Sequence, residues 1–327
     1  MTETVLFSLD ELRAAADLVH RHVPPTPQFE WPLLSSAIGA SVVVKHENHT
    51  PTGAFKVRGG IVYMDRLARE RPEVRGVVSA TRGNHGQSMA FAGRVTGTPV
   101  TIVAPVGNSP DKNASMRGWG AELIEHGHDF QASREHAEVL ARERGLEMVP
   151  SYHRDLVLGV ATYALELFDA VEDLDTVYVP VGMGSGVCGL ITARDLLGLR
   201  TEIVGVVAAN APATALSFAA GAAVNSDTAA TFIDGVACRV PDAEAIAVIC
   251  RGASRIVEVP EDACAEAVRL LYSTTHNVAE PAGAVATAAL MMERERQQGR
   301  RVATILTGGN IDTSLLGTIF SGVTPQP

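Results

Sequence analysis

The order of apolar and polar residues along the chain predicts an alternating series of strands and helices. Ser8 and Glu11 have the spacing of a capping box, and apolar residues then recur at helical spacing until Pro24, Pro25 and Pro27 end the helix. Further on, short apolar runs alternate with segments of helical periodicity. The expected strands are 41–45, 77–80, 100–104 and 122–125, and the expected helices are 61–69, 87–95, one around residue 114, and 130–144.

The same alternation continues in the second half of the chain. Residues 177–181, 203–208 and 303–306 form apolar runs, each followed by a Gly-rich or polar turn and then by a helical segment. Because strands that alternate with helices form parallel sheets with helices on their faces, we predict two α/β domains. The expected divide lies near residues 145–155, where glycine, proline and polar residues interrupt the pattern.

Composition places the chain in a broad class. A length of 327 residues suits two domains, and a hydrophobic content of 46% is enough for buried cores. The net charge of −10 argues against nucleic acid or an anionic membrane as a main partner. The first five residues have neither a basic segment nor an apolar run, so we expect no signal peptide and a cytoplasmic protein.

One lysine stands at a position that suits chemistry. Lys56 follows Phe55 directly and lies three residues after Gly53, where a turn should give way to a helix. On this segment alone, Lys56 is equally well explained as an ordinary surface charge.

A glycine-rich loop follows the predicted strand 177–181. It consists of Gly182, Met183, Gly184, Ser185 and Gly186, before a predicted helix 187–197. Backbone N–H groups in such a loop can converge on an anion at the positive end of the helix dipole, although glycine also serves tight turns. The loop lacks the Gly-x-Gly-x-x-Gly spacing, and no Walker lysine follows it. A single phosphate on a small cofactor therefore fits better than NAD, and a nicotinamide-dependent oxidoreductase is disfavoured.

Two more strand ends carry polar residues. The first is a loop of hydrogen-bond donors before a helix, and it consists of Thr81, Arg82, Gly83, Asn84 and His85. Such a loop can bind the carboxylate of an amino acid. Alternatively, it is an ordinary polar helix start in which Asn84 caps the helix. The second is Thr307, which precedes Gly308, Gly309 and Asn310. Two glycines permit close approach to the backbone, but this segment alone indicates only a turn.

Taken together, the four segments resemble the fold-type II enzymes that use pyridoxal 5′-phosphate, over nearly the whole chain. The Phe-Lys-x-Arg-Gly sequence at residues 55–59 looks like that of the serine/threonine dehydratases, whereas cysteine and threonine synthases usually carry Asp where Val57 stands. The resemblance implies a tryptophan synthase β-like fold with the cofactor between two domains. Residues 1–45 and 150–327 would form a large cofactor-binding domain, and residues 46–149 a small mobile domain.

The resemblance also implies roles for individual residues. Lys56 would form a Schiff base with the cofactor aldehyde and then remove the Cα proton, and burial beside Phe55 would keep its amine neutral. Asn84 would bond the ring hydroxyl, residues 182–186 would hold the phosphate, and Thr307 would face the pyridine nitrogen. A neutral hydroxyl at that nitrogen favours elimination over transamination. Glu280 matches a family segment near the cofactor, and it is equally well explained as an acid at a helix N-terminus.

The implied reaction is loss of the α-proton and the β-hydroxyl from a 3-hydroxy amino acid, giving a 2-oxo acid and ammonia. L-Threonine and L-serine are the expected substrates, and a larger or acidic 3-hydroxy amino acid is an alternative. A β-replacement synthase of the same fold is the nearest rival. Racemases of this family use a serine where Arg82 stands, so racemisation is disfavoured. We hypothesise that Arg82 shapes substrate choice, although it could simply point to solvent. A non-catalytic amino-acid-binding protein would have no need of Lys56.

No metal site is expected. Relatives with a bound cation use carboxylates after the strand equivalent to 203–208, and residues 208–214 contain none. His46 and His49 lead directly into the Lys56 segment and are not expected to bind zinc.

The four cysteines lack Cys-x-x-Cys spacing and are expected to be reduced. We expect a homodimer or a homotetramer.

Overall fold

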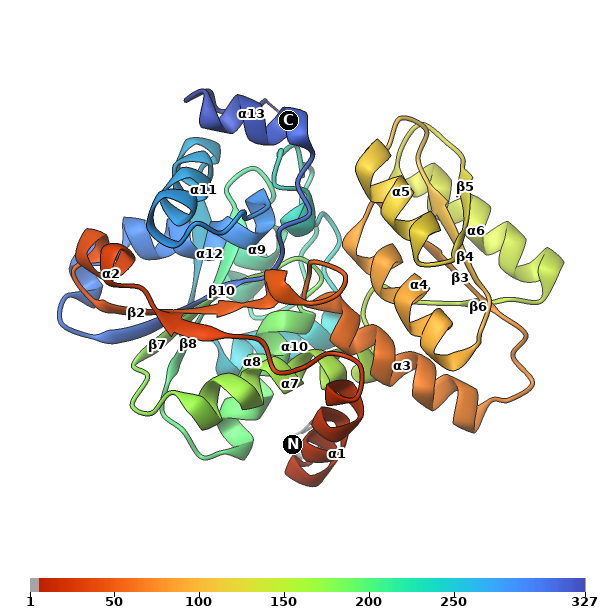
Figure 1. Ribbon diagram of the computed structural model, residues 1–327, viewed down its shortest axis with the longest axis horizontal. Coiled ribbons are helices and arrows are strands. Elements are labelled where there is room, and N and C mark those ends of the chain that lie inside the picture. Colours follow the sequence, from red (N-terminus) through yellow and green to blue (C-terminus); the bar gives the residue numbers. More distant parts are fainter. Residues whose placement is uncertain (1–5, 327) are drawn as a thin grey trace.

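The structure is a computed structural model that describes residues 6–326, and Figure 1 shows its elements in two groups, each built on a sheet. Met1 to Val5, on which the expectation of no signal peptide rests, lie outside the described residues. The strands are β1 (Gln28–Glu30), β2 (Ser41–His46), β3 (Val77–Ala80), β4 (Val100–Ala104), β5 (Glu122–Glu125), β6 (Glu147–Met148), β7 (Thr176–Pro180), β8 (Glu202–Ala208), β9 (Arg255–Val259) and β10 (Arg301–Leu306).

Helices connect most of these strands. They are α1 (Leu9–His20), α2 (Pro32–Ile38), α3 (Lys56–Glu70), α4 (Asn84–Thr96), α5 (Pro110–Gly118), α6 (Phe130–Arg144), α7 (Arg154–Ala170), α8 (Ser185–Leu196), α9 (Ala213–Ala220), α10 (Ala243–Gly252), α11 (Glu261–Thr275), α12 (Pro281–Met292) and α13 (Thr313–Phe320), with the short 3-10 helices η1 (Glu47–His49), η2 (Asp234–Val236) and η3 (Arg294–Gln297).

The larger sheet has the strand order β1-β2-β10-β7-β8-β9. All of its neighbouring pairs are parallel except β1 with β2, which are antiparallel. Alternate residues of each strand face opposite sides of the sheet. Val43 therefore packs in one apolar cluster with α1, α7, α8 and α10, while Val42 and Val44 pack in a second with α2, α11 and α12. Burial on both faces explains why these strands are continuous apolar runs in the sequence.

The smaller sheet is fully parallel, with the order β5-β4-β3-β6. It is covered by α6 on one face, where Val78 and Val103 pack with Leu140. Helix α3 lies between the two groups and packs on both α4 and α7 (Figure 1). The carboxyl ends of β3 and β10 lead into the polar loops that the sequence singled out, so the fold directs those loops to a common region.

The predicted α/β fold is confirmed, but two helices begin earlier than expected. Helix α3 begins at Lys56 instead of residue 61, and α4 begins at Asn84 instead of residue 87. Two glycines in the first turns of α3 are required by packing. A Cβ at Gly59 would lie 2.7 Å from the carbonyl oxygen of Leu156, and one at Gly60 would lie 2.9 Å from that of Ser88. The glycines therefore permit close contact between helices, and they do not break α3.

Other features agree with the sequence more closely. The capping box of Ser8 and Glu11 is formed in both directions. The four cysteines are free thiols, and Cys188, Cys238 and Cys264 are buried. Within residues 6–326, no helix combines the length and apolar character needed to cross a bilayer.

Candidate active site

Lys56 is the first residue of α3 and is held there by contacts to the end of β10. The backbone N–H of Phe55 donates to the carbonyl oxygen of Thr307 at 3.0 Å, and Ala54 forms an antiparallel bridge with Gly308. The N–H of Gly309 in turn donates to the carbonyl oxygen of Gly53 at 2.9 Å. Two segments about 250 residues apart in sequence are thus joined by their backbones, and Lys56 emerges at the junction.

The second junction joins Asn84 to this pair of segments. Asn84 donates a side-chain N–H to Glu280 Oε1 at 2.6 Å and accepts one from Asn310 at 2.8 Å. Asn310 also donates to the carbonyl oxygen of Thr52 at 2.8 Å. Both ends of the Asn84 amide are therefore fixed.

Glu280 occupies the N-cap position of α12, but its side chain makes no capping hydrogen bond. The carboxylate turns instead toward Asn84 and toward Gly308, where an added Cβ would lie 2.4 Å from Oε1. Thr307 is buried nearby and donates its hydroxyl to the carbonyl oxygen of Ala282 at 3.2 Å. Of the two interpretations of Glu280, the contacts favour the one that places it in the site.

The glycine loop 182–186 lies between β7 and α8. Gly184 is the N-cap of α8 with a φ of 103°, in the region that favours glycine, and a Cβ at Gly182 would lie 2.4 Å from the carbonyl oxygen of Gly235. Among the described residues, no acceptor is bonded to the backbone N–H groups of residues 182–187. Met183 contacts Cys238 through sulfur, and Ser185 opens the helix. Such a run of unpaired donors at a helix N-terminus is suited to a phosphate.

Tyr163 of α7 connects this loop to Lys56. Its hydroxyl donates to the carbonyl oxygen of Gly186 at 3.2 Å, and its ring meets that of Phe55 edge-on at 6.2 Å between centroids. Lys56 Nζ lies 4.4 Å from the centroid of the Phe55 ring. The lysine and the glycine loop are therefore neighbours, joined by two aromatic rings.

The polar loop before α4 has a mixed environment. Thr81 is buried and accepts the N–H of Gly83 at 3.2 Å, while Arg82 is exposed. Gly83 lies under the side chain of Lys112, since an added Cβ would be 2.8 Å from its Cδ. The Nε2 atom of His85 is buried and has no hydrogen-bond partner among the described residues.

The electrostatics of these groups are set by burial. Burial lowers the pKa of the Lys56 amine, against the opposing effect of Glu280. Burial, with a smaller effect of Lys56, lowers the pKa of His85 to about 4, so the imidazole is neutral at pH 7. Burial raises the pKa of Glu280 despite Lys112 and Asn84. The site therefore favours a neutral amine at Lys56, the form that is nucleophilic and basic.

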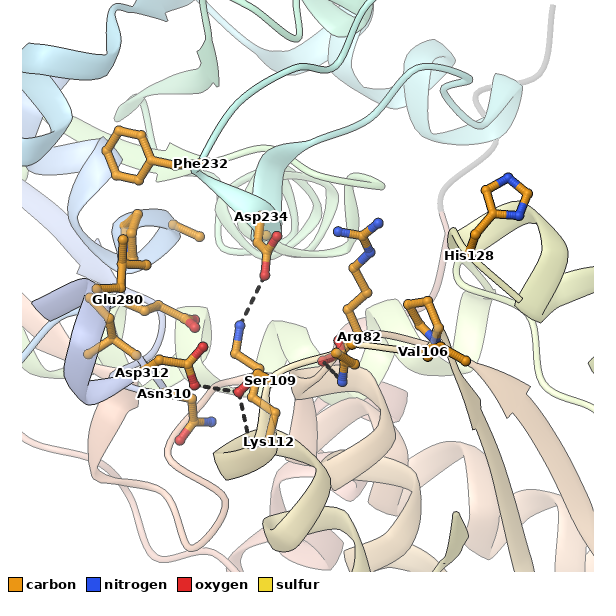
Figure 2. Close-up of a pocket in the computed structure, with 18 residues that line it drawn as sticks. Arg82, Val106, Ser109, Lys112, His128, Phe232, Asp234, Glu280, Asn310 and Asp312 are labelled. Atoms are coloured by element: carbon orange, nitrogen blue, oxygen red, sulfur yellow. Dashed lines mark hydrogen bonds and ion pairs between the residues drawn. The ribbon is translucent and has the colours of Figure 1, made fainter. Parts of the chain in front are cut away.

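A cavity of about 310 Å³ opens beside Glu280 and Asn310 (Figure 2). Its walls come from the part of the chain around the smaller sheet, with Arg82 and with Lys112 of α5, and from the part around the larger one, with Asp234 of η2. Lys112 Nζ pairs with Asp234 at 3.0 Å, and Ser109 donates to Asp312. Burial alone would lower the pKa of the Lys112 amine. The negative charges of Asp234 and Glu280 have a larger effect and raise this pKa.

Several residues that join distant segments were not predicted from the sequence. Tyr163, Lys112 and Asp234 were not singled out, because nothing local distinguishes an aromatic residue in an apolar helix or a charged residue in a short helix. Arg58 was noted only as part of the Phe-Lys-x-Arg-Gly sequence; it is fully buried and forms ion pairs with Glu47 and Glu166. Among residues 6–326, no three His, Cys, Asp or Glu side chains gather as metal ligands would.

Comparisons with known proteins agree on one class. The sequence profile of the family described as "Pyridoxal-phosphate dependent enzyme" matches residues 19–308. L-Threonine ammonia-lyase of Thermotoga maritima is 30% identical over 97% of this chain and 79% of the relative. L-threo-3-Hydroxyaspartate ammonia-lyase of Saccharomyces cerevisiae is 29% identical over 96% of each. The processed threonine deaminase isoform 2 of Solanum lycopersicum superposes with a TM-score of 0.89 at 28% identity, over 96% of this chain and 94% of that one.

Proposed function

The chain belongs to the pyridoxal-phosphate-dependent enzyme family, and from this premise we propose that it converts a 3-hydroxy amino acid into a 2-oxo acid and ammonia by α,β-elimination. The expected cofactor, pyridoxal 5′-phosphate, and the expected fold-type II architecture are confirmed. The observation that carries the proposal is the position of Lys56. Its amine has a lowered pKa and lies where residues 52–56 meet residues 307–310 and Asn84.

The residues of the site fit this cofactor. The unpaired N–H groups of residues 182–187 and the dipole of α8 suit its phosphate, and Ser185 adds a hydroxyl. Lys56 suits its aldehyde. The rings of Phe55 and Tyr163 lie between this lysine and the glycine loop. When bound, the cofactor supplies an electron sink that stabilises negative charge at the substrate Cα.

Lys56 is the residue proposed to move the α-proton. Its Nζ accepts the proton from Cα in the neutral form that burial favours. His85 is also neutral at pH 7, so it adds no positive charge beside Lys56. Loss of the β-hydroxyl as water leaves an enamine, and its hydrolysis consumes one water and releases the 2-oxo acid and ammonia.

Asn84 is proposed to orient the cofactor ring. Its amide has two N–H donors, and Glu280 uses one of them. The second remains for the ring hydroxyl. Because Glu280 and Asn310 fix both ends of the amide, the direction of that second N–H is set before the cofactor enters.

The loop of residues 81–85 is proposed to bind the substrate carboxylate. The backbone N–H groups of Arg82, Asn84 and His85 have no acceptor among the described residues, whereas that of Thr81 donates to Val103 and that of Gly83 to the Thr81 hydroxyl. Thr307, whose hydroxyl is neutral, is proposed to face the pyridine nitrogen. A hydroxyl there does not enforce a protonated ring, which favours elimination over transamination.

The wider properties of the protein belong to the same proposal. Residues 46–149 would move as a small domain against residues 1–45 and 150–327, with the Lys112–Asp234 and Ser109–Asp312 contacts formed on closure. We further propose a cytoplasmic homodimer or homotetramer. A racemase or a β-replacement synthase of the same fold is the alternative activity, and Arg82 and Val57, respectively, argue against them.

The proposal is tested with the purified, cofactor-loaded protein. L-Serine, L-threonine, 3-hydroxyaspartate and phenylserine are supplied as both enantiomers, and ammonia and 2-oxo acid are measured together with the enantiomeric purity of the remaining amino acid. Equal amounts of ammonia and 2-oxo acid from at least one substrate, lost in Lys56→Ala, support the proposal. Enantiomer interconversion without ammonia would identify a racemase instead.

A further inference from the structure

The cavity beside Glu280 has room for a side chain that carries a charged group. Its volume of about 310 Å³ equals about ten times the volume of a water molecule in the liquid. A threonine methyl group would fill a small part of it. Its lining is also rich in charge, whereas a pocket for a methyl group is expected to be apolar.

Most of the charges on this lining already have partners. Asp234 pairs with Lys112, and Asp312 accepts from Ser109. Glu280 accepts from Asn84 and is a weaker acid than usual, because burial raises its pKa. These contacts leave the acidic groups of the cavity satisfied by the protein itself.

Arg82 differs from these residues. No carboxylate of residues 6–326 lies within ion-pair distance of its guanidinium, and the hydrogen bond at this residue, from Asn108, goes to its backbone oxygen. The side chain is exposed and lines the cavity, and Figure 2 shows it extending from the smaller sheet toward the loop of Asp234. A guanidinium is always protonated in proteins and presents parallel donors that match a carboxylate.

Arg82 is also close in sequence to the residues proposed to bind the substrate. It lies two residues before Asn84, in the loop proposed to hold the α-carboxylate. We infer that the preferred substrate carries a second carboxylate at or beyond Cβ, which Arg82 binds in this cavity, and that serine and threonine are poor substrates. This inference rests on the proposed elimination reaction and narrows its substrate class.

The test compares Arg82→Ala and Arg82→Lys with a matched control, Arg75→Ala. Arg75 is an exposed arginine before β3, at the opposite end of that strand from Arg82. For the wild type, kcat/KM for L-threo-3-hydroxyaspartate should exceed that for serine and threonine by about tenfold or more. Arg82→Ala should reduce it by about tenfold to a hundredfold, mainly through KM, and any loss of kcat/KM for serine in the same variant should be smaller by about tenfold. Arg82→Lys should be intermediate, and Arg75→Ala should match the wild type.

A binding measurement tests whether Arg82 binds a carboxylate without requiring the elimination reaction. Succinate, a dicarboxylate without an amine, is titrated calorimetrically into each cofactor-loaded protein. Arg82→Ala should weaken its binding by about tenfold or more, and Arg75→Ala should leave it unchanged.

The outcomes separate the two claims. If serine or threonine is the better substrate and Arg82→Ala affects all substrates equally, the inference is wrong and the proposed elimination stands. If no 3-hydroxy amino acid yields ammonia, the proposed elimination fails. In that case Arg82-dependent succinate binding would still support a dicarboxylate ligand, and succinate binding that is absent or independent of Arg82 would overturn it.

Discussion

Asn84 and Glu280 are 196 residues apart in sequence, and the side-chain amide of Asn84 donates to the buried carboxylate of Glu280 at 2.6 Å. This hydrogen bond joins the first turn of α4, beside the smaller sheet, to the start of α12 beside the larger one. If Asn84 orients the cofactor ring as proposed, Glu280 is a positioning residue that acts on the cofactor through Asn84.

Replacing Glu280 should therefore weaken cofactor binding in a graded way. Glu280→Ala leaves the donor of Asn84 without its acceptor, and we expect the Kd for pyridoxal 5′-phosphate to rise by about tenfold, measured by absorbance titration. Glu280→Gln keeps a carbonyl oxygen and should restore most of the affinity. If Glu280→Ala bound the cofactor as tightly as the wild type, the positioning role would be wrong.

The chain contains three lysines, Lys45, Lys56 and Lys112, so amine reactivity can be assigned by peptide mapping. In protein freed of cofactor, an amine-reactive reagent should modify Lys56 first. Its pKa lies below the ordinary 10.5, so its labelling rate should rise with pH and level off before that of an exposed lysine. Lys112 should react slowly because Asp234 helps to raise its pKa, and Lys45 is fully buried. Added pyridoxal 5′-phosphate should protect Lys56. Labelling of Lys112 at an equal rate would contradict this ranking.

The glycine loop offers a test of phosphate binding. Gly184→Ala places a side chain at a φ of 103°, with its Cβ 2.9 Å from that of Ala245, so the loop must shift. We expect a rise of about tenfold or more in the Kd for pyridoxal 5′-phosphate, with a smaller effect on Kd for a cofactor analogue that lacks the phosphate. Gly118→Ala is the control, because nothing lies within 4 Å of an added Cβ there. Equal weakening for both ligands would argue against a phosphate site.

The buried charges beneath α3 should control stability at low pH. Burial opposes ionisation of Glu166, but Arg58 and Lys45 outweigh it and hold the pKa of its carboxyl at about 2, below the ordinary 4.5. As pH falls, the Glu166 carboxyl is protonated in the unfolded state before it is protonated in the folded state. Its contribution to the free energy of unfolding is therefore present above pH 4.5 and is lost toward pH 2.

Glu166→Gln should accordingly lower the free energy of unfolding by about 3 kcal/mol at pH 7, measured by denaturant titration. The difference from the wild type should shrink as pH falls below 4.5. Glu143→Gln, at an exposed position, should change the unfolding free energy by less than about 0.5 kcal/mol. A difference that stays constant with pH would show that the ion pairs are not its source.

The sequence predicted those parts of the molecule that local patterns determine. The capping box of Ser8 and Glu11 depends on residues three apart. The strand 77–80 is buried at all four positions and mostly apolar, because both faces of its sheet are covered. The early start of α3 was not predicted from the sequence. Gly59 and Gly60 serve close contacts with α7 and α4, which lie far along the chain.

The same limit applies to the site. The sequence brought Lys56, Asn84, the loop 182–186 and Thr307 together through a family resemblance, without saying how they touch. The contacts that link them, from Asn310 to Asn84 and from Tyr163 to Gly186, depend on how distant helices pack. The Lys112–Asp234 pair spans 122 residues and could not be anticipated from either neighbourhood.

The claim that Lys56 carries the cofactor is tested most directly by borohydride reduction of the cofactor-loaded protein, followed by peptide mapping. Reduction fixes the cofactor to the amine that holds it, and the chain has three lysines to distinguish. The account predicts a phosphopyridoxyl group on Lys56 and none in Lys56→Ala. A group on Lys45 or Lys112 of the wild type, or no group on any lysine, would contradict it.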